Sequence, residues 1–133
     1  MAGRGGITSR KTVYDGTITK NTTENNGAWF SYASSVSGAF YVDLDSASTI
    51  TINMHFSHLT VEEIAALVAA GTTLTTEHYI EEEVQAAHTA TALTKYKPTT
   101  LDDPIMSMRM NIDETGNSAD AVLKIYFVSF DID

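Results

Sequence analysis

The chain contains no cysteine, which excludes disulfide bonds, thiolate zinc sites and cysteine nucleophiles. It has only two prolines, and 43% of its residues are hydrophobic, a composition typical of a folded chain. No apolar run approaches the roughly 20 residues that span a bilayer. The first residues, MAGRGGITSRKT, lack the apolar stretch of a secretory signal. These absences predict a soluble protein of one domain, made in a cytoplasm and without a membrane partner.

Signatures of catalysis are also absent. The sequence contains no G-x-S-x-G nucleophile elbow, no phosphate-binding glycine loop, no H-E-x-x-H zinc motif and no dinucleotide fingerprint. We therefore expect a protein that is not an enzyme and that needs no cofactor.

Positive charge is scarce and unevenly placed. Eight Lys and Arg stand against 17 Asp and Glu, for a net charge of −9. Residues 1–20 carry half of the bases and a single acid, Asp15, so this segment has a net charge of +3 and the remainder has −12. A basic segment on an acidic body can bind a foreign polyanion such as nucleic acid, or it can bind the body of another copy.

Residues 1–20 are predicted to form an extended N-terminal arm. Residues 1–10 are rich in glycine and hold one aliphatic side chain, so we expect them to order only on contact with another molecule. Residues 11–20 alternate as a strand does, either as the first strand of the domain or as one that completes a neighbour's sheet. The arm residues expected to touch a neighbouring subunit are Arg4, Arg10, Lys11, Val13, Tyr14 and Ile18.

Residues 21–133 are predicted to form a single acidic, β-rich domain, since Thr and other β-branched residues recur throughout. The last two expected strands are predicted to pair as a hairpin through a turn at Gly116 and Asn117. The final strand is apolar on both faces, so both faces must be covered. The expected strands are residues 28–32, 39–44, 48–56, 106–113 and 122–132.

One α-helix is expected at about residues 60–70. Thr60 and Glu63 form a capping box, an apolar stripe follows at helical spacing, and Gly71 supplies a left-handed stop. Residues 75–97 are ambiguous, because their Thr-rich ends favour strand or loop while their middle has the composition of a helix. The fold expected is mainly β, an antiparallel β-sandwich or barrel (jelly-roll-like or tube-protein-like) with one helix and the arm.

Two groups of titratable side chains are candidates for chemistry. His55 and His58 lie near a helix that carries two glutamates, but no third ligand is fixed by spacing, so we expect no metal and keep the two histidines as weak candidates. His55 is expected on the outward side of its strand. An acidic run is interpreted as a solvated face or as a docking strip for the basic arm. That run comprises Glu77, Glu81, Glu82 and Glu83.

Aromatic and oxygen-rich segments have simpler interpretations. Trp29, Phe30 and Tyr32 could stack on sugars or bases, although alternating aromatics on a strand more often pack in a core or an interface. The acidic loop around Glu114 and Asp120 offers oxygen ligands for calcium but lacks the EF-hand spacing. A turn rich in Asp and Asn needs no metal to explain it.

Two functions of different class fit these observations. The first is a structural protein that assembles in many copies, most readily a virion component (capsid, decoration or tail protein) whose arm clasps a neighbouring subunit. Such a protein would reside in virions assembled in the host cytoplasm, with copies of itself and other virion proteins as partners. The architecture resembles that of small viral coat and tail proteins, although no family motif is matched. The alternative is a small non-catalytic module that binds carbohydrate, protein or nucleic acid.

Overall fold

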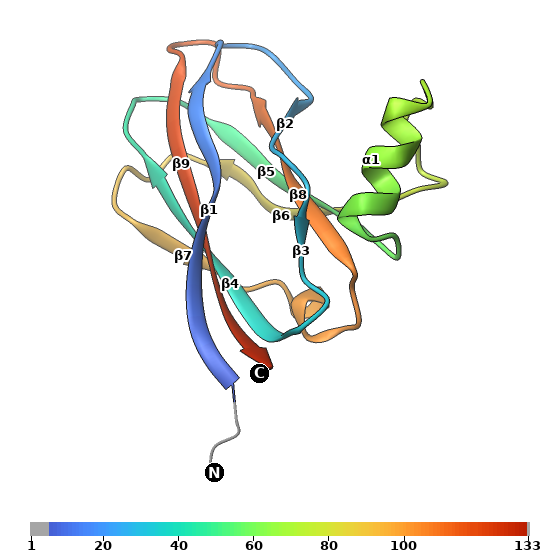
Figure 1. Ribbon diagram of the computed structural model, residues 1–133. Coiled ribbons are helices and arrows are strands. Elements are labelled where there is room, and N and C mark those ends of the chain that lie inside the picture. The colour runs from blue at the N-terminus through green and yellow to red at the C-terminus, as the bar shows by residue number, and fades with distance from the viewer. Residues whose placement is uncertain (1–5, 133) are drawn as a thin grey trace.

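Two antiparallel sheets pack face to face in the computed structural model, which describes residues 6–132 (Figure 1). Sheet A has the strand order β1-β9-β4-β7, and sheet B has the order β2-β8-β5-β6 with β3 also paired to β8. The predicted β-sandwich is confirmed. The strands are β1 (Gly6–Ile18), β2 (Asn25–Asn26), β3 (Phe30–Ser31), β4 (Ser35–Leu44), β5 (Ile50–Ser57), β6 (Ile80–His88), β7 (Thr94–Tyr96), β8 (Ser107–Glu114) and β9 (Ala121–Ile132).

The core lies between the sheets and follows from strand alternation. Alternate residues of β4, β5, β8 and β9 point inward, and most of them are buried. Phe127 of β9 sits among three other aromatic rings, with ring centroids 5.3 to 5.7 Å away. Gly38 lets this ring approach, because a Cβ at that position would lie 2.3 Å from it. Fully buried aliphatic and aromatic side chains each contribute roughly 1.5–3 kcal/mol to folding.

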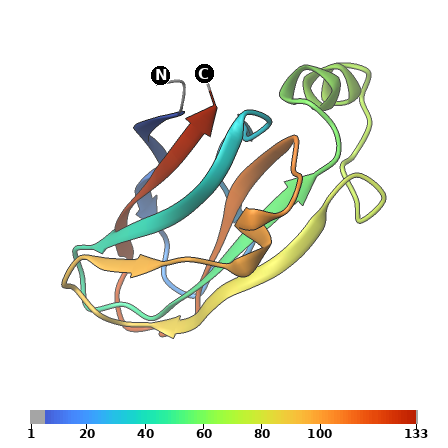
Figure 2. The same ribbon diagram turned by 90° about the horizontal axis from the view of Figure 1, so that it is seen from below.

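The one α-helix, α1 (Val61–Ala69), begins and ends where the sequence predicts. Thr60 Oγ1 accepts from the Glu63 amide at 3.1 Å, and the Glu63 carboxylate accepts from the Thr60 amide at 3.0 Å, so the capping box is complete. Gly71 adopts φ +84°, the left-handed stop. A short 3-10 helix, η1 (Thr99–Asp102), precedes β8. Figure 2 shows α1 standing beside the two layers rather than on either of them.

The predicted C-terminal hairpin is wrong. Strand β8 belongs to sheet B and pairs with β5, whereas β9 belongs to sheet A and pairs with β1 and β4. The six residues 115–120 therefore cross from one sheet to the other, a gap of about 10 Å. The inward faces of β8 and β9 meet in the one core cluster between the sheets, where Met110 and Ile125 are both fully buried. A short loop can join strands of the same sheet or of facing sheets, and alternation does not distinguish the two.

Residues 80–88 form a strand, so the helix considered for the middle of residues 75–97 is also wrong. Strand β6 pairs with β5 over most of its length and forms an edge of sheet B. The period-two spacing prevails over helix propensity here, because β5 offers an unpaired edge and tertiary pairing overrides weak local preference.

Residues 6–18 do not behave as a free arm. Strand β1 pairs with β9 of the same chain from Gly6 to Ile18, with one irregularity between Thr12 and Tyr14. We expected residues 6–10 to take up structure only on contact with another molecule. They are instead ordered within the chain, because β9 of the same chain supplies their backbone partners. Residues 1–5 of the predicted arm lie outside the described residues.

Candidate contact surface

The predicted arm residues divide between the core and the surface. Val13 and Ile18 are buried, and Tyr14 is half-buried, where burial raises the pKa of its hydroxyl. Arg10 is exposed, and its guanidinium lies 5.5 Å from the centre of the Tyr126 ring on β9. Lys11 is exposed at the sheet edge, with its ammonium 5.6 Å from the Phe30 ring. Arg4 lies outside the described residues.

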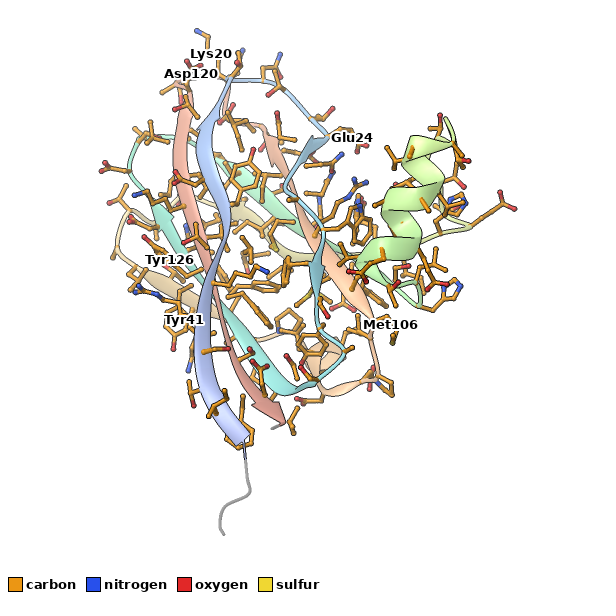
Figure 3. All side chains as sticks on the ribbon, viewed as in Figure 1. Lys20, Glu24, Tyr41, Met106, Asp120 and Tyr126 are labelled. Carbon is orange, nitrogen blue, oxygen red and sulfur yellow. The ribbon has the colours of Figure 1, made fainter. Side chains whose placement is uncertain are left out.

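The outer face of sheet A, the side turned away from sheet B, carries an exposed apolar row. Three neighbouring outward residues of β9 are apolar: Tyr126 and Val128 are half-buried and Phe130 is 44% exposed. Val122, also 44% exposed, is separated from them by the exposed Lys124. Register places Tyr41 of β4 directly beside Tyr126 on the same side. Figure 3 shows Tyr41 and Tyr126 on the side of the molecule away from α1. Within residues 6–132, no element covers this row.

Basic side chains border this apolar row. Arg10 stands next to Val128 across the β1–β9 pair, and Lys95 of β7 stands next to Tyr41. Lys95 and Lys97 line a shallow hollow together with Tyr41, Val128 and Phe130. Lys124 and Asp43 face each other on neighbouring strands of the same sheet. The face therefore has an apolar centre and a mainly basic border.

The outer face of sheet B is different, because its polar side chains are buried and bonded to one another. Arg109 Nε donates to His55 Nδ1 at 3.0 Å, and His55 Nε2 lies 2.8 Å from Glu81 Oε1. A guanidinium can only donate, so His55 Nδ1 accepts and its Nε2 hydrogen is directed to the carboxylate. Burial lowers the pKa of His55, with the Arg109 charge adding to the effect and Glu81 opposing it. His55 is thus held neutral in one tautomer.

Two aromatic residues from loops cover this cluster. Tyr79 stacks on His55 with ring centroids 4.1 Å apart. The Arg109 guanidinium lies 4.8 Å from the centre of the Trp29 ring and 5.3 Å from that of Tyr79, within the range of cation–π attraction. Burial lowers the pKa of Arg109. The expectation that His55 is simply outward-facing needs correction, because the side chain is on the outer side of β5 but fully buried.

A separate row of bonded amides lies on the same face of sheet B. Asn53 Nδ2 donates to Asn111 Oδ1 at 3.2 Å, and Asn111 Nδ2 donates to Asn26 Oδ1 at 2.6 Å. Asn53 and Asn111 are buried, and their bonds run from β5 through β8 to β2. Polar groups buried in this way stay favourable only because they are paired.

The weak metal candidates do not form a site. His55 is occupied by Arg109 and Glu81, whereas His58 is exposed in the loop after β5. Among residues 6–132, no group of three or more His, Cys, Asp or Glu side chains is arranged to hold a metal ion.

The acidic run is only partly free in the structure. Glu81 is bonded to His55, and Glu82 accepts a hydrogen bond from the Thr100 hydroxyl. Glu77 and Glu83 are exposed. Whether this strip docks a basic segment of another copy stays a prediction, with two of its four carboxylates already engaged.

The three aromatic candidates lie on different sides of sheet B. Phe30 and Tyr32 are buried in the core, where the Tyr32 hydroxyl donates to the Leu101 carbonyl and burial, followed by Asp102 and Asp131, raises its pKa to about 12. Trp29 packs on Arg109 at the outer face. They form no common platform for a sugar or a base.

Glu114 has a structural role that its sequence context did not reveal. Its carboxylate is buried and accepts four backbone N–H bonds of 2.8 to 3.1 Å. Burial acts to raise the pKa of Glu114, but the four donors outweigh it and hold the pKa below its usual value. This carboxylate fastens three loops together at one end of the sandwich, which explains the acidic loop without calcium. The four donors are the amides of Asn21, Thr49, Gly116 and Asn117.

Arg109, Tyr79 and Tyr126 were missed as important residues. Arg109 is the only Lys or Arg on the strands of sheet B within the described chain, and a single basic residue between Met108 and Met110 was a usable signal. Tyr79 and Tyr126 gave no such signal, because their partners are remote in the sequence.

Comparison with known proteins gives a likeness to virus-particle chains. No protein-family model matches the sequence, and no curated protein matches it. A chain of the infectious bursal disease virus VP2 subviral particle is similar over 96% of this chain and 33% of that chain, with a TM-score of 0.51 and 11% identity. T=1 particles derived from the same virus give a TM-score of 0.45 and 14% identity over 92% of this chain and 31% of that chain.

The likeness is one of fold. The chain spans about one third of the length of the viral chain with which it superimposes. No helix in residues 6–132 is long and apolar enough to cross a membrane.

Proposed function

We propose that the chain is a structural protein that assembles in many copies through the outer face of sheet A. The observation that carries this proposal is the apolar row of β9, which lies open in residues 6–132. Single exposed apolar residues are ordinary, whereas a contiguous apolar patch with a polar border is typical of an interface. The contiguous patch comprises Tyr41, Tyr126, Val128 and Phe130, and the bases at its border are Arg10, Lys95, Lys97 and Lys124. Lys124 has Asp15 and Asp43 on the neighbouring strands and separates Val122 from the patch.

In this proposal the assembly is part of a virion, as a capsid, decoration or tail protein built in the host cytoplasm, with no catalytic role. The similarity of fold to a chain of the VP2 subviral particle supports it. A fold by itself hosts many functions, so the argument depends on the exposed surface as well. Copies of the chain and other virion proteins are the proposed partners.

Strand β1 supplies the clasp in this proposal, by exchange between copies. It lies at the edge of sheet A and its only strand partner within the described chain is β9, so a copy could lend β1 to a neighbour's β9 in the same register. Exchange of this kind conserves every contact of β1, including the burial of Val13 and Ile18.

Self-assembly is tested by sedimentation velocity and light scattering over a wide concentration range, followed by electron microscopy. We expect the mass to rise with concentration. Phe130→Glu should abolish the rise, whereas Leu93→Glu, which replaces an exposed apolar residue in the loop between β6 and β7, should leave it unchanged. A wild-type chain that stays monomeric throughout would overturn the proposal. Association that appears only with added nucleic acid or glycan would favour the binding-module alternative.

The clasp has its own test, made simple by the absence of cysteine. Ser9 and Ser129 face each other across β1 and β9, with their hydroxyl oxygens 3.3 Å apart. In the variant Ser9→Cys, Ser129→Cys, exchange predicts disulfide-linked oligomers on oxidation of the assembled protein. A disulfide formed only within single chains would contradict exchange while leaving the surface contact intact.

A further inference from the structure

Helix α1 is an exposed element on the side of the molecule opposite the outer face of sheet A. Of its nine residues only Ile64 is buried. Val68 is 55% exposed, and after Glu63 the helix and its cap contain no polar side chain. A shallow apolar hollow runs along it, lined by Leu59, Glu63, Ala66, Leu67 and Ala70. Most helices in globular domains place polar residues along their exposed side, and this one does so only in its first turn.

The two exposed apolar surfaces have opposite charge. The first turn of α1 carries Glu62 and Glu63, and the helix has no base in its last turn. The outer face of sheet A is bordered mainly by bases, among them Arg10 and Lys95. A cationic border meeting an acidic helix is attractive, whereas two copies of either surface facing each other would repel.

From these features, and on the basis of the proposed self-assembly, we propose that helix α1 of one copy packs on the outer face of sheet A of the next. The arrangement of layers supports this occupant. A sheet whose outer face is apolar is stable when a helix or another sheet covers it. The chain's own helix cannot do so, because it lies beyond β3 and β8 on the far side of the sandwich (Figure 1).

Such a contact is head-to-tail, since each copy offers a helix at one side and a sheet face at the other. Contacts of this type generate rings, shells or filaments rather than a closed two-fold dimer. Polymerisation therefore follows from the placement of α1 and sheet A on opposite sides of one domain.

The size of the helix sets the strength of one contact. Nine residues at 1.5 Å per residue span about 14 Å, which covers about three strands at 4.8 Å spacing. A helix of this length buries less than the roughly 800 Å² per partner of a stable two-protein interface. A single contact is thus weak, and many contacts in a closed shell or tube add to a stable particle.

The experiment uses two full-length variants, each with one blocked surface. The helix-blocked variant carries Val68→Lys and Ala69→Lys, exposed substitutions that favour the helix C-terminus and bring positive charge against the basic border. The sheet-blocked variant carries Phe130→Glu. Each alone should be monomeric, with association weakened about tenfold or more, equivalent to about 1.4 kcal/mol. Mixed one to one, they should form a dimer that grows no further, because the mixture holds one intact helix and one intact face.

The outcomes separate this inference from the proposed function. If the wild type assembles and the helix-blocked variant assembles equally well, α1 is not the occupant and the inference is overturned, although self-assembly stands. If both variants are monomeric and the mass of their mixture does not rise up to about 1 mM, a concentration at which one weak contact is populated, the head-to-tail contact is also overturned. A wild type that never associates removes the proposed function and the inference together. Circular dichroism and a melting curve on each variant establish that it is folded.

Discussion

The outer faces of the two sheets differ in exposure, and the difference is the opposite of what hydropathy predicts: polar residues are buried on sheet B, and apolar residues are exposed on sheet A. On sheet B the outward residues are polar or charged, yet Asn53, His55 and Asn111 are buried. On sheet A the outward residues of β9 are largely apolar, yet Val122 and Phe130 are well exposed. The polar face is satisfied inside the chain by hydrogen bonds and by aromatic rings from loops. The apolar face is not covered within residues 6–132.

The two faces differ in what their side chains contribute: those of sheet B stabilise the fold, and those of sheet A are free to contact a partner. The cluster on sheet B contributes to the stability of the single chain, since its bonds and stacking contacts lie wholly within it. If the proposed assembly forms, removing a side chain from the outer face of sheet A should destabilise the single chain little and the assembly much. Stability and association should therefore respond to different substitutions.

The largest loss of folding stability is expected from a substitution on sheet B. His55→Ala should lower the free energy of unfolding by about 3 kcal/mol, because it leaves a cavity under Tyr79 and removes the bonds to Arg109 and Glu81. Phe130→Ala on sheet A should cost about 1 kcal/mol or less, since 44% of that side chain is already exposed. Urea unfolding of dilute protein measures both. Equal losses for the two variants would contradict the proposed division between the faces.

A somewhat smaller loss is expected at the end of the sandwich where the sheets are joined. Glu114→Gln should cost about 2 kcal/mol, because an amide keeps one acceptor oxygen and turns an NH2 group toward backbone donors. The native pKa of Glu114 is depressed, so its contribution is present above the ordinary glutamate value of about 4.3 and is lost as pH falls through the native pKa. The variant should therefore show a shallower loss of stability in acid, measured by urea unfolding from pH 7 to pH 3. If the wild type and the variant lose stability equally between pH 7 and pH 3, Glu114 does not have this structural role.

Much of the fold was predictable from local pattern. The helix at residues 60–70 was marked by its capping box and by Gly71, both of which depend on neighbours within a few residues. Strand alternation over residues 48–56 placed β5 correctly. The separation of the last two strands into different sheets was not predictable in the same way, because alternation says which residues share a face and does not say which sheet a strand joins.

The candidate surface was predicted in part. The alternation of residues 122–132 showed that both faces of the last strand are apolar. Because both faces must be covered, the sequence indicated a contact with another subunit. Burial of His55 was not foreseeable, because the residues that cover it come from separate loops around Trp29 and Tyr79. The sequence left open which β9 pairs with β1. An edge strand has the same residue pattern whether its partner belongs to its own chain or to a neighbouring copy.

A modest dependence of stability on pH is expected near neutrality, from two buried histidines on sheet B. Burial lowers the pKa of His55 and of His88, whose Nδ1 lies 2.6 Å from the Tyr96 hydroxyl. Unfolded histidine binds a proton near pH 6.5, so stability should be full above that pH and should fall as pH drops below it. His88→Phe should reduce this slope. Urea midpoints at pH 7.5 and pH 5.5 measure it, and a wild-type midpoint that does not move would contradict neutral burial of both rings.

The smallest effect on stability is expected at the basic border of sheet A, where association should respond instead. Lys95→Ala should change the free energy of unfolding by less than about 0.5 kcal/mol, because the side chain is exposed and forms no ion pair within residues 6–132. It should weaken self-association at low salt, and the difference from wild type should fade towards 1 M salt, where screening acts over about 3 Å. Lys20→Ala is the matched control, since it removes the same charge from a loop at one end of the sandwich, apart from Tyr41 and Tyr126 (Figure 3). Equal weakening by both variants would mean that net charge, and not the border of this face, governs association.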